Sequence, residues 1–106
     1  NRNNISKEEE CIDANNTVEK VYAHIRALIS WPVGYIMVAD KKIKIHAARR
    51  GTNKVSNEIG TLFTENKNLY LQCLDGSIEL LEVQLEGKAK CSAKDFMNGA
   101  GRKFIQ

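Results

Sequence analysis

The stretch LDGSIELLEVQLEGKAKCSAKDFMNG, residues 74–99, contains the signals of a turn, a strand, a loop and a helix in succession. Asp75-Gly76 is a two-residue hairpin signal, and the apolar run at 77–85 is typical of a long strand. Ser92, with an acidic residue three positions later, forms a capping box, and Gly99 fits a helix C-cap. The stretch therefore predicts a closing strand followed by a short helix over residues 93–98.

Upstream of this stretch, apolar residues recur with a period close to two, which indicates strands. Residues 33–39 and 43–50 form one predicted hairpin, joined by a turn at Asp40-Lys41-Lys42, so that its tip and one face are basic. Residues 60–65 and 69–74 form a second pair around an Asn-Lys-Asn turn. Together with the strand at 77–85, the sequence predicts five strands.

A helix is predicted over residues 16–30, in front of the strands. Asn16 and Glu19 form a capping box, and Pro32 disfavours helical geometry in the residue before it. Apolar residues at helical spacing give this helix one buried face, made of Val18, Val21, Tyr22, Ile25, Leu28 and Ile29. Residues 1–14 are polar and without periodicity, so they are interpreted as an interdomain linker, and residues 15–106 as the domain.

The order of these elements predicts a mainly β, α+β fold. Several short antiparallel strands with tight turns favour a small, closed or nearly closed OB-like barrel, with the N-terminal amphipathic helix over one open side. The short C-terminal helix would then lie at the end of the barrel. A chain of 106 residues has the length of one domain.

Composition and charge restrict the function classes. With 42% hydrophobic and 27% charged residues, the chain resembles an ordinary soluble globular domain, and no apolar run approaches the roughly 18 residues of a membrane span. Residues 1–19 hold two basic and five acidic side chains, which leaves fourteen basic and eight acidic ones in the remainder. This basic body indicates an anionic partner. The three cysteines include no C-x-x-C pair, which favours a reducing compartment.

No catalytic motif is present in the sequence. It lacks a G-x-S-x-G elbow, an H-E-x-x-H helix, a P-loop and a dinucleotide fingerprint, so no catalytic, metal or cofactor site is predicted in this chain. His24 and His46 are interpreted as surface or half-buried imidazoles, and the cysteines as structural residues. Glu79 and Glu82 are interpreted as solvated charges at the rim, on opposite sides of their strand.

Basic residues are the remaining candidates for function. Three aromatic residues lie within strands and are predicted to be core: Phe63, Tyr70 and Tyr35. Stacking on bases is therefore not expected to be the main contribution to nucleic-acid binding. A nucleic acid would instead be bound through its phosphates. The candidate contacts in the body of the domain are Lys41, Lys42, Lys44, Arg49, Arg50, Lys88 and Lys90.

Five motifs in a fixed order carry a resemblance to a known family. They are I-S-K-E-E-x-x-I-D (5–13), I-R-A-L-x-x-W-P (25–32), G-T-L (60–62), D-G-x-x-x-L-L-x-x-Q-x-x-G-K (75–88) and S-A-K-D-F-x-N-G (92–99). Their order and spacing resemble the C-terminal domain of methionyl-tRNA formyltransferases, over nearly the whole chain. Family members usually have proline where this chain has Ser30 and Ile59.

The resemblance implies an accessory domain without catalysis of its own. In that family an N-terminal Rossmann-like domain binds 10-formyltetrahydrofolate and carries an Asn-His-Asp constellation, and neither that constellation nor its S-L-L-P companion occurs here. The C-terminal OB-like domain binds the phosphate backbone of initiator tRNA non-specifically, in the cytoplasm, for translation initiation. Lys7 matches a linker lysine that contacts tRNA in the family, whereas Asn3 and Asn4 stand where other lysines would be.

A second interpretation has no role for nucleic acid. Formyltransferases that act on sugar nucleotides or other small molecules share this architecture, and their C-terminal domain would mainly pack on the catalytic domain or assemble subunits. The basic residues would then serve only solubility. The S-K-E-E linker and the G-K-x-K and S-A-K-D-F motifs resemble the tRNA enzyme more closely, which favours the first interpretation.

Overall fold

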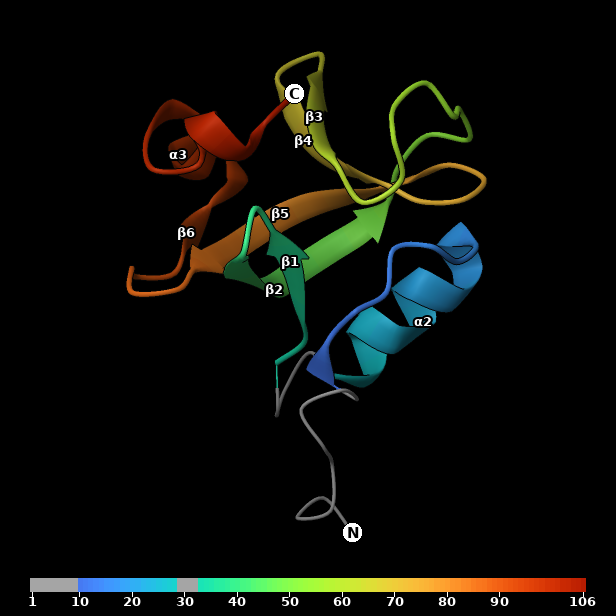
Figure 1. Ribbon diagram of the computed structural model, residues 1–106, viewed down its shortest axis with the longest axis horizontal. Helices are drawn as coiled ribbons and strands as arrows, with labels where there is room; N and C mark the ends of the chain where they lie inside the picture. The colour runs from blue at the N-terminus through green and yellow to red at the C-terminus, as the bar shows by residue number, and fades with distance from the viewer. Residues whose placement is uncertain (1–9, 29–32) are drawn as a thin grey trace, which may run out of the picture.

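The computed structural model describes residues 10–28 and 33–106 (Figure 1). In this part of the chain, six strands form one sheet, accompanied by two α-helices and a short 3-10 helix. None of the described helices combines the length and the apolarity that crossing a membrane requires. The elements are, in chain order, α2 Val18–Ala27, β1 Tyr35–Val38, β2 Lys41–Arg50, β3 Leu62–Glu65, β4 Asn68–Gln72, β5 Ser77–Leu85, β6 Cys91–Ser92, α3 Ala93–Asn98 and η2 Arg102–Phe104.

The sheet is antiparallel, with strand order β1-β2-β5-β4-β3, and β6 pairs with β5 beyond the end of β4. The predicted mainly β, α+β class is confirmed. Within the described residues no ladder joins β1 to β3, so the sheet does not close and the predicted barrel describes it only loosely. The two-residue strand β6 is an addition to the five predicted strands, because the sequence gives too short a pattern to reveal it.

Helix α2 covers the inner face of the sheet, against β2 and β5 (Figure 1). Val21, Ile25 and Leu28 are buried in the core, as the helical spacing predicted, whereas Val18 and Tyr22 are half-buried at the margin. Ile29 and Ser30 lie outside the described residues. The amphipathic helix therefore provides one wall of a core whose other wall is the sheet.

The start of α2 differs from the prediction. Thr17, and not Asn16, is the N-cap, and its Oγ1 accepts a hydrogen bond from the Lys20 N–H at 3.3 Å. Asp75 lies across from the helix and accepts the Val18 N–H at 2.8 Å. Because a helix start leaves N–H groups without intrahelical partners, Asp75 fixes the β4–β5 connection onto α2.

Two connections are also built differently from the prediction. The first turn consists of Ala39 and Asp40, both at positive φ (50° and 65°), so Lys41 and Lys42 belong to β2. The β4–β5 connection spans residues 73–76, not the two predicted ones, and Cys73 N–H donates to the Gly76 carbonyl at 2.7 Å. A Cβ at Gly76 would lie 2.5 Å from the Thr52 carbonyl oxygen, so close backbone approach requires glycine there.

The described part of the predicted linker belongs to the folded structure. Ile12 and Ala14 are buried in the core, and the Ile12 N–H donates to the Tyr35 carbonyl at 2.7 Å. Residues 10–14 therefore pack on the edge of the sheet beside β1 (Figure 1). The domain boundary at residue 14 stays a prediction.

Candidate functional site

Two lysines of β2, Lys42 and Lys44, lie on the outer face of the sheet. Ile43 and Ile45 are buried on the inner face, and Lys42 and Lys44 alternate with them along the strand. Because successive side chains of a strand point to opposite faces, both lysines are directed away from the core. Lys41 is exposed at the start of the same strand.

The loop after β5 is held against the start of β2. The Lys42 N–H donates to Oε1 of Glu86 at 2.6 Å, and the Glu86 N–H donates to the Lys42 carbonyl at 2.9 Å. Gln84 lies opposite Lys44 in the β2–β5 register, and its Nε2 donates to the Lys88 carbonyl at 3.0 Å. These bonds hold the Gly-Lys-x-Lys loop beside the start of β2, at the same end of the β2–β5 ladder as the β2 lysines.

We call the surface formed by Lys41, Lys42, Lys44, Lys88 and Lys90 the basic face. Four of its lysines are exposed, and Lys42 is half-buried with Nζ 4.8 Å from the centre of the Tyr35 ring. A cavity of about 200 Å³ lies between Lys42, Lys44 and the turn at Glu86 and Gly87. Across residues 10–28 and 33–106, none of the five lysines is ion-paired with a carboxylate. Their charge is therefore available to an anionic partner.

Arg49 and Arg50, the other two candidates in the body, are held in ion pairs. Arg49 binds Glu79 through Nε and Nη2, at 2.9 and 3.2 Å. Arg50 binds Glu19 at 2.7 and 2.8 Å and lies over the ring of Tyr22. These hydrogen bonds raise the pKa of both guanidinium groups and lower the pKa of the Glu19 carboxyl. Both arginines thus fasten the end of β2 to its neighbours.

The prediction that Glu79 is a solvated charge at the rim is wrong, because this residue is only 7% exposed. The bidentate contact with Arg49 compensates the charge that burial would otherwise leave unpaired. Lys7 lies outside the described residues, so its contact stays a prediction.

The structure shows two further lysines that the candidate set omits. Lys67 lies in the β3–β4 turn and Lys94 in the first turn of α3, and both line a second outer cleft together with Met97. Nothing in the local sequence places a turn lysine beside a helix lysine, so only the tertiary arrangement reveals the pair.

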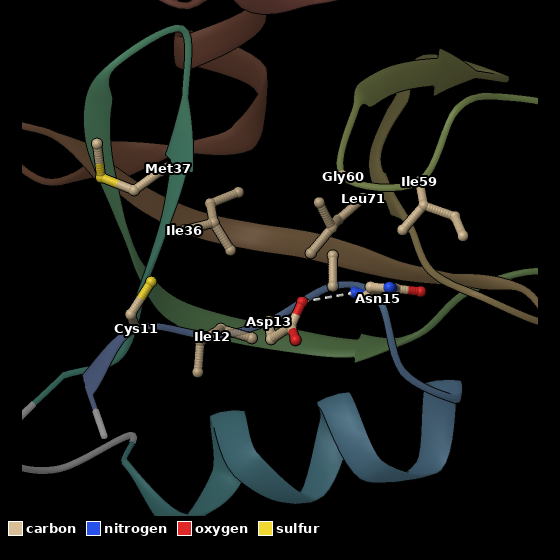
Figure 2. Close-up of a pocket in the computed structure, with 10 residues that line it drawn as sticks. Cys11, Ile12, Asp13, Asn15, Ile36, Met37, Ile59, Gly60 and Leu71 are labelled. Atoms are coloured by element: carbon tan, nitrogen blue, oxygen red, sulfur yellow. Dashed lines mark hydrogen bonds between the residues drawn. The ribbon is translucent and has the colours of Figure 1, made fainter. Parts of the chain in front are cut away.

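Among the described strands, the sheet stays open between its edge strands β1 and β3, and we call this gap the open seam. It forms a third hollow, of about 300 Å³ (Figure 2). Cys11, Asp13 and Asn15 line one side of it, and Met37 and Ile59 lie on the other, as Figure 2 shows. The Asp13 carboxylate accepts the Asn15 N–H at 3.0 Å, so its polar group closes a local turn. This hollow is mostly apolar and brings no pair of titratable groups into contact.

Two of the three cysteines, Cys73 and Cys91, lie in surroundings that disfavour a reactive thiolate. Cys73 is fully buried, and burial, followed by the nearby Asp75 charge, raises the pKa of its thiol to about 12. Burial also raises the pKa of Cys91. A raised pKa disfavours the reactive thiolate. In the part of the chain that the structure describes, no three histidine, cysteine or acidic side chains gather to hold a metal.

Sequence comparison matches residues 4–101 to the family model described as formyl transferase, C-terminal domain. The chain belongs to this family. The resemblance noted from the motifs is thereby confirmed.

Curated relatives of this formyltransferase C-terminal domain are named methionyl-tRNA formyltransferase. The chain is 42% identical to the protein of Lactobacillus johnsonii and 43% identical to that of Lactobacillus gasseri, in both cases over 102 residues. It is 36% identical to the protein of Streptococcus agalactiae. Each alignment covers 95% of this chain and 32% of the relative. The chain therefore spans about a third of the length of these relatives.

Solved structures share the fold of this formyltransferase C-terminal domain at low sequence identity. HypX from Aquifex aeolicus in complex with tetrahydrofolic acid matches with a TM-score of 0.70 at 15% identity, over 96% of this chain and 18% of HypX. A HypX variant, A392F-I419F, matches with a TM-score of 0.69. At this identity the similarity concerns the fold alone.

Proposed function

We propose that this formyltransferase C-terminal domain is a non-catalytic tRNA-binding module of a methionyl-tRNA formyltransferase. It holds initiator tRNA by its phosphate backbone, while a separate Rossmann-like domain of the parent protein transfers the formyl group from 10-formyltetrahydrofolate. The domain itself binds neither folate nor metal in this proposal. Its setting would be translation initiation in the cytoplasm.

The basic face is the observation that carries the proposal. Five lysines from the start of β2 and from the loop after β5 lie at one end of the β2–β5 ladder without carboxylate partners among the described residues. Phosphate contacts by such lysines supply affinity and orientation without reading sequence. Phe63 and Tyr70 are buried and stack on each other at 5.3 Å between ring centres, so they are not available for stacking on bases.

The names of the relatives support tRNA as the anion. They act, by name, on methionyl-tRNA, and this chain matches about a third of their length. That this chain binds the same substrate as these relatives is part of the proposal. A domain that only packs on a catalytic domain would not require an unpaired basic face.

A salt titration tests the proposal. Fluorescence anisotropy with a labelled initiator tRNA transcript is measured between 50 and 200 mM KCl. Five phosphate contacts predict a slope of log affinity against log salt of about −3.5 to −4.5, hence a loss of affinity of about 130- to 500-fold over this range. The Lys88→Ala/Lys90→Ala variant removes two contacts, which lowers the expected loss to about 20- to 40-fold.

A matched control is the Lys20→Gln/Arg26→Gln variant, which removes the same charge from exposed positions of α2, on the opposite face of the sheet from Lys42 and Lys44. Its slope should equal that of the unmodified chain, and an elongator tRNA should bind as tightly as the initiator. Absence of binding at 50 mM KCl would overturn the proposal and favour the packing role. Equal slopes for the two double variants would remove the basic face as the contact surface.

A further inference from the structure

A second cleft lies between the β3–β4 turn and α3, which Figure 1 shows side by side. It consists of two adjoining hollows, of about 400 and 460 Å³, and Lys67, Lys94 and Met97 line both of them. The basic face does not include these residues. The cleft is therefore a separate feature of the outer surface.

The walls of the cleft combine positive charge with an apolar floor. Lys67 and Lys94 are exposed, come from different elements, and are not ion-paired within the described residues. Met97 and Leu81 are half-buried and supply thioether and aliphatic surface. Glu79 also lines the cleft, but Arg49 holds its carboxylate. The net charge of the cleft is accordingly positive.

This combination matches the chemistry of a nucleotide unit in RNA. Two ammonium groups can share one phosphodiester, and a polarisable methionine beside an aliphatic side chain gives a nucleobase a flat apolar contact. Hollows of several hundred Å³ have the size of small-molecule sites. Surface lysines without such a floor would offer only diffuse attraction.

The cleft also lies close to the basic face. β5 contributes Leu81 to the cleft and Gln84 to the cavity beside Lys44, and three residues of strand span about 10 Å. The loop that carries Lys90 leads directly into Ser92, at the cleft wall, and then into Lys94. One nucleic-acid chain can therefore follow the protein surface from the basic face into the cleft.

We propose that the cleft between the β3–β4 turn and α3 binds one phosphodiester and the adjoining base of the RNA that the basic face holds. Lys67 and Lys94 contact the phosphate, and Met97 lies under the base. This proposal rests on the proposed tRNA-binding function. It adds a defined nucleotide site to what would otherwise be a diffuse electrostatic surface.

The two methionines of the chain provide the test, because Met97 lies in the cleft and Met37 lies opposite Lys42 of the basic face in the β1–β2 register. Chain labelled with ¹³C in the methionine methyl groups is titrated with unlabelled initiator tRNA transcript at 50 mM KCl. A base stacked on Met97 should shift its methyl proton resonance upfield by ring current. The resonance of Met37 reports contact at the basic face and should lack this upfield shift, because phosphates and not bases are bound there.

A charge variant gives a second readout. Lys67 has φ of 68°, a conformation that asparagine tolerates, so the variant is Lys67→Asn/Lys94→Gln. Because both lysines contact one phosphate, its salt slope should fall by about one contact, or about 0.7 to 0.9 units, relative to the Lys20→Gln/Arg26→Gln control. If the chain binds RNA but the Met97 resonance does not move and the two slopes agree, the cleft site is wrong and the tRNA-binding proposal stands. If the unmodified chain does not bind RNA, both proposals fail.

Discussion

Ile25 is one of the residues through which α2 packs into the core. It is 2% exposed and belongs to the core cluster between α2 and the sheet. Ile25→Ala removes three carbon atoms, worth about 2.4 kcal/mol at ~0.8 kcal/mol for each buried methylene. The remaining cavity adds to this loss, whereas the better helix propensity of alanine returns only a few tenths of a kcal/mol. The free energy of unfolding should fall by about 3 kcal/mol.

Ile59→Ala is a matched control, because it removes the same atoms from a side chain that is 36% exposed at the open seam. Thermal unfolding followed by far-UV circular dichroism should give a decrease in Tm of about 12 °C or more for Ile25→Ala, at about 4 °C or more for each kcal/mol. Ile59→Ala should change Tm much less. Equal decreases for the two variants would refute the packing of α2 on the sheet.

Two further predictions concern titratable groups. The pKa of Glu19 is lowered from 4.5 by its hydrogen bonds with Arg50, so its stabilising contribution is complete above the unfolded-state pKa and is lost as pH falls through the lower folded-state pKa. The urea midpoint of Glu19→Gln should therefore lie below that of the unmodified chain at pH 7, and the difference should shrink as pH falls below 4.5; a difference that does not change with acidification would contradict the pairing. The pKa of Cys73 is raised to about 12, so iodoacetamide at pH 8 should modify Cys11, which is half-buried, and spare Cys73 until urea unfolds the chain. Peptide mass mapping that finds Cys73 alkylated first in the folded chain would show that its position is wrong.

Local signals in the sequence predicted the elements whose boundaries depend on neighbouring residues. The strand at Ser77–Leu85 and the helix at Ala93–Asn98, with Ser92 and Gly99 as its caps, have the predicted bounds. Ser92 Oγ accepts the Asp95 N–H at 3.1 Å, as a capping box requires. In these cases the deciding contacts join residues a few positions apart.

The features that the sequence could not predict depend on contacts between segments that are distant in the chain. The Asp75 carboxylate binds the Val18 N–H, and this contact accompanies a longer β4–β5 connection than the expected turn. Glu79 is buried because Arg49 pairs with it from the neighbouring strand. Lys67 and Lys94 meet at one cleft only because α3 packs beside the β3–β4 hairpin. The sequence shows the chemical type of each of these residues, but it does not show which distant residue each one contacts.

The candidate basic residues that the structure describes fall into two groups, ion-paired arginines and lysines without ion pairs, and this difference affects how the domain would bind RNA. Arg49 and Arg50 form bidentate pairs with carboxylates, a geometry that the planar guanidinium provides and an ammonium group does not. In the basic face and the second cleft, by contrast, all the positively charged residues are lysines. Lysine is a compact, strongly hydrated point charge, so such contacts are tolerant of geometry and sensitive to salt. A module built in this way would bind the backbone of many RNAs weakly, without discriminating between their sequences.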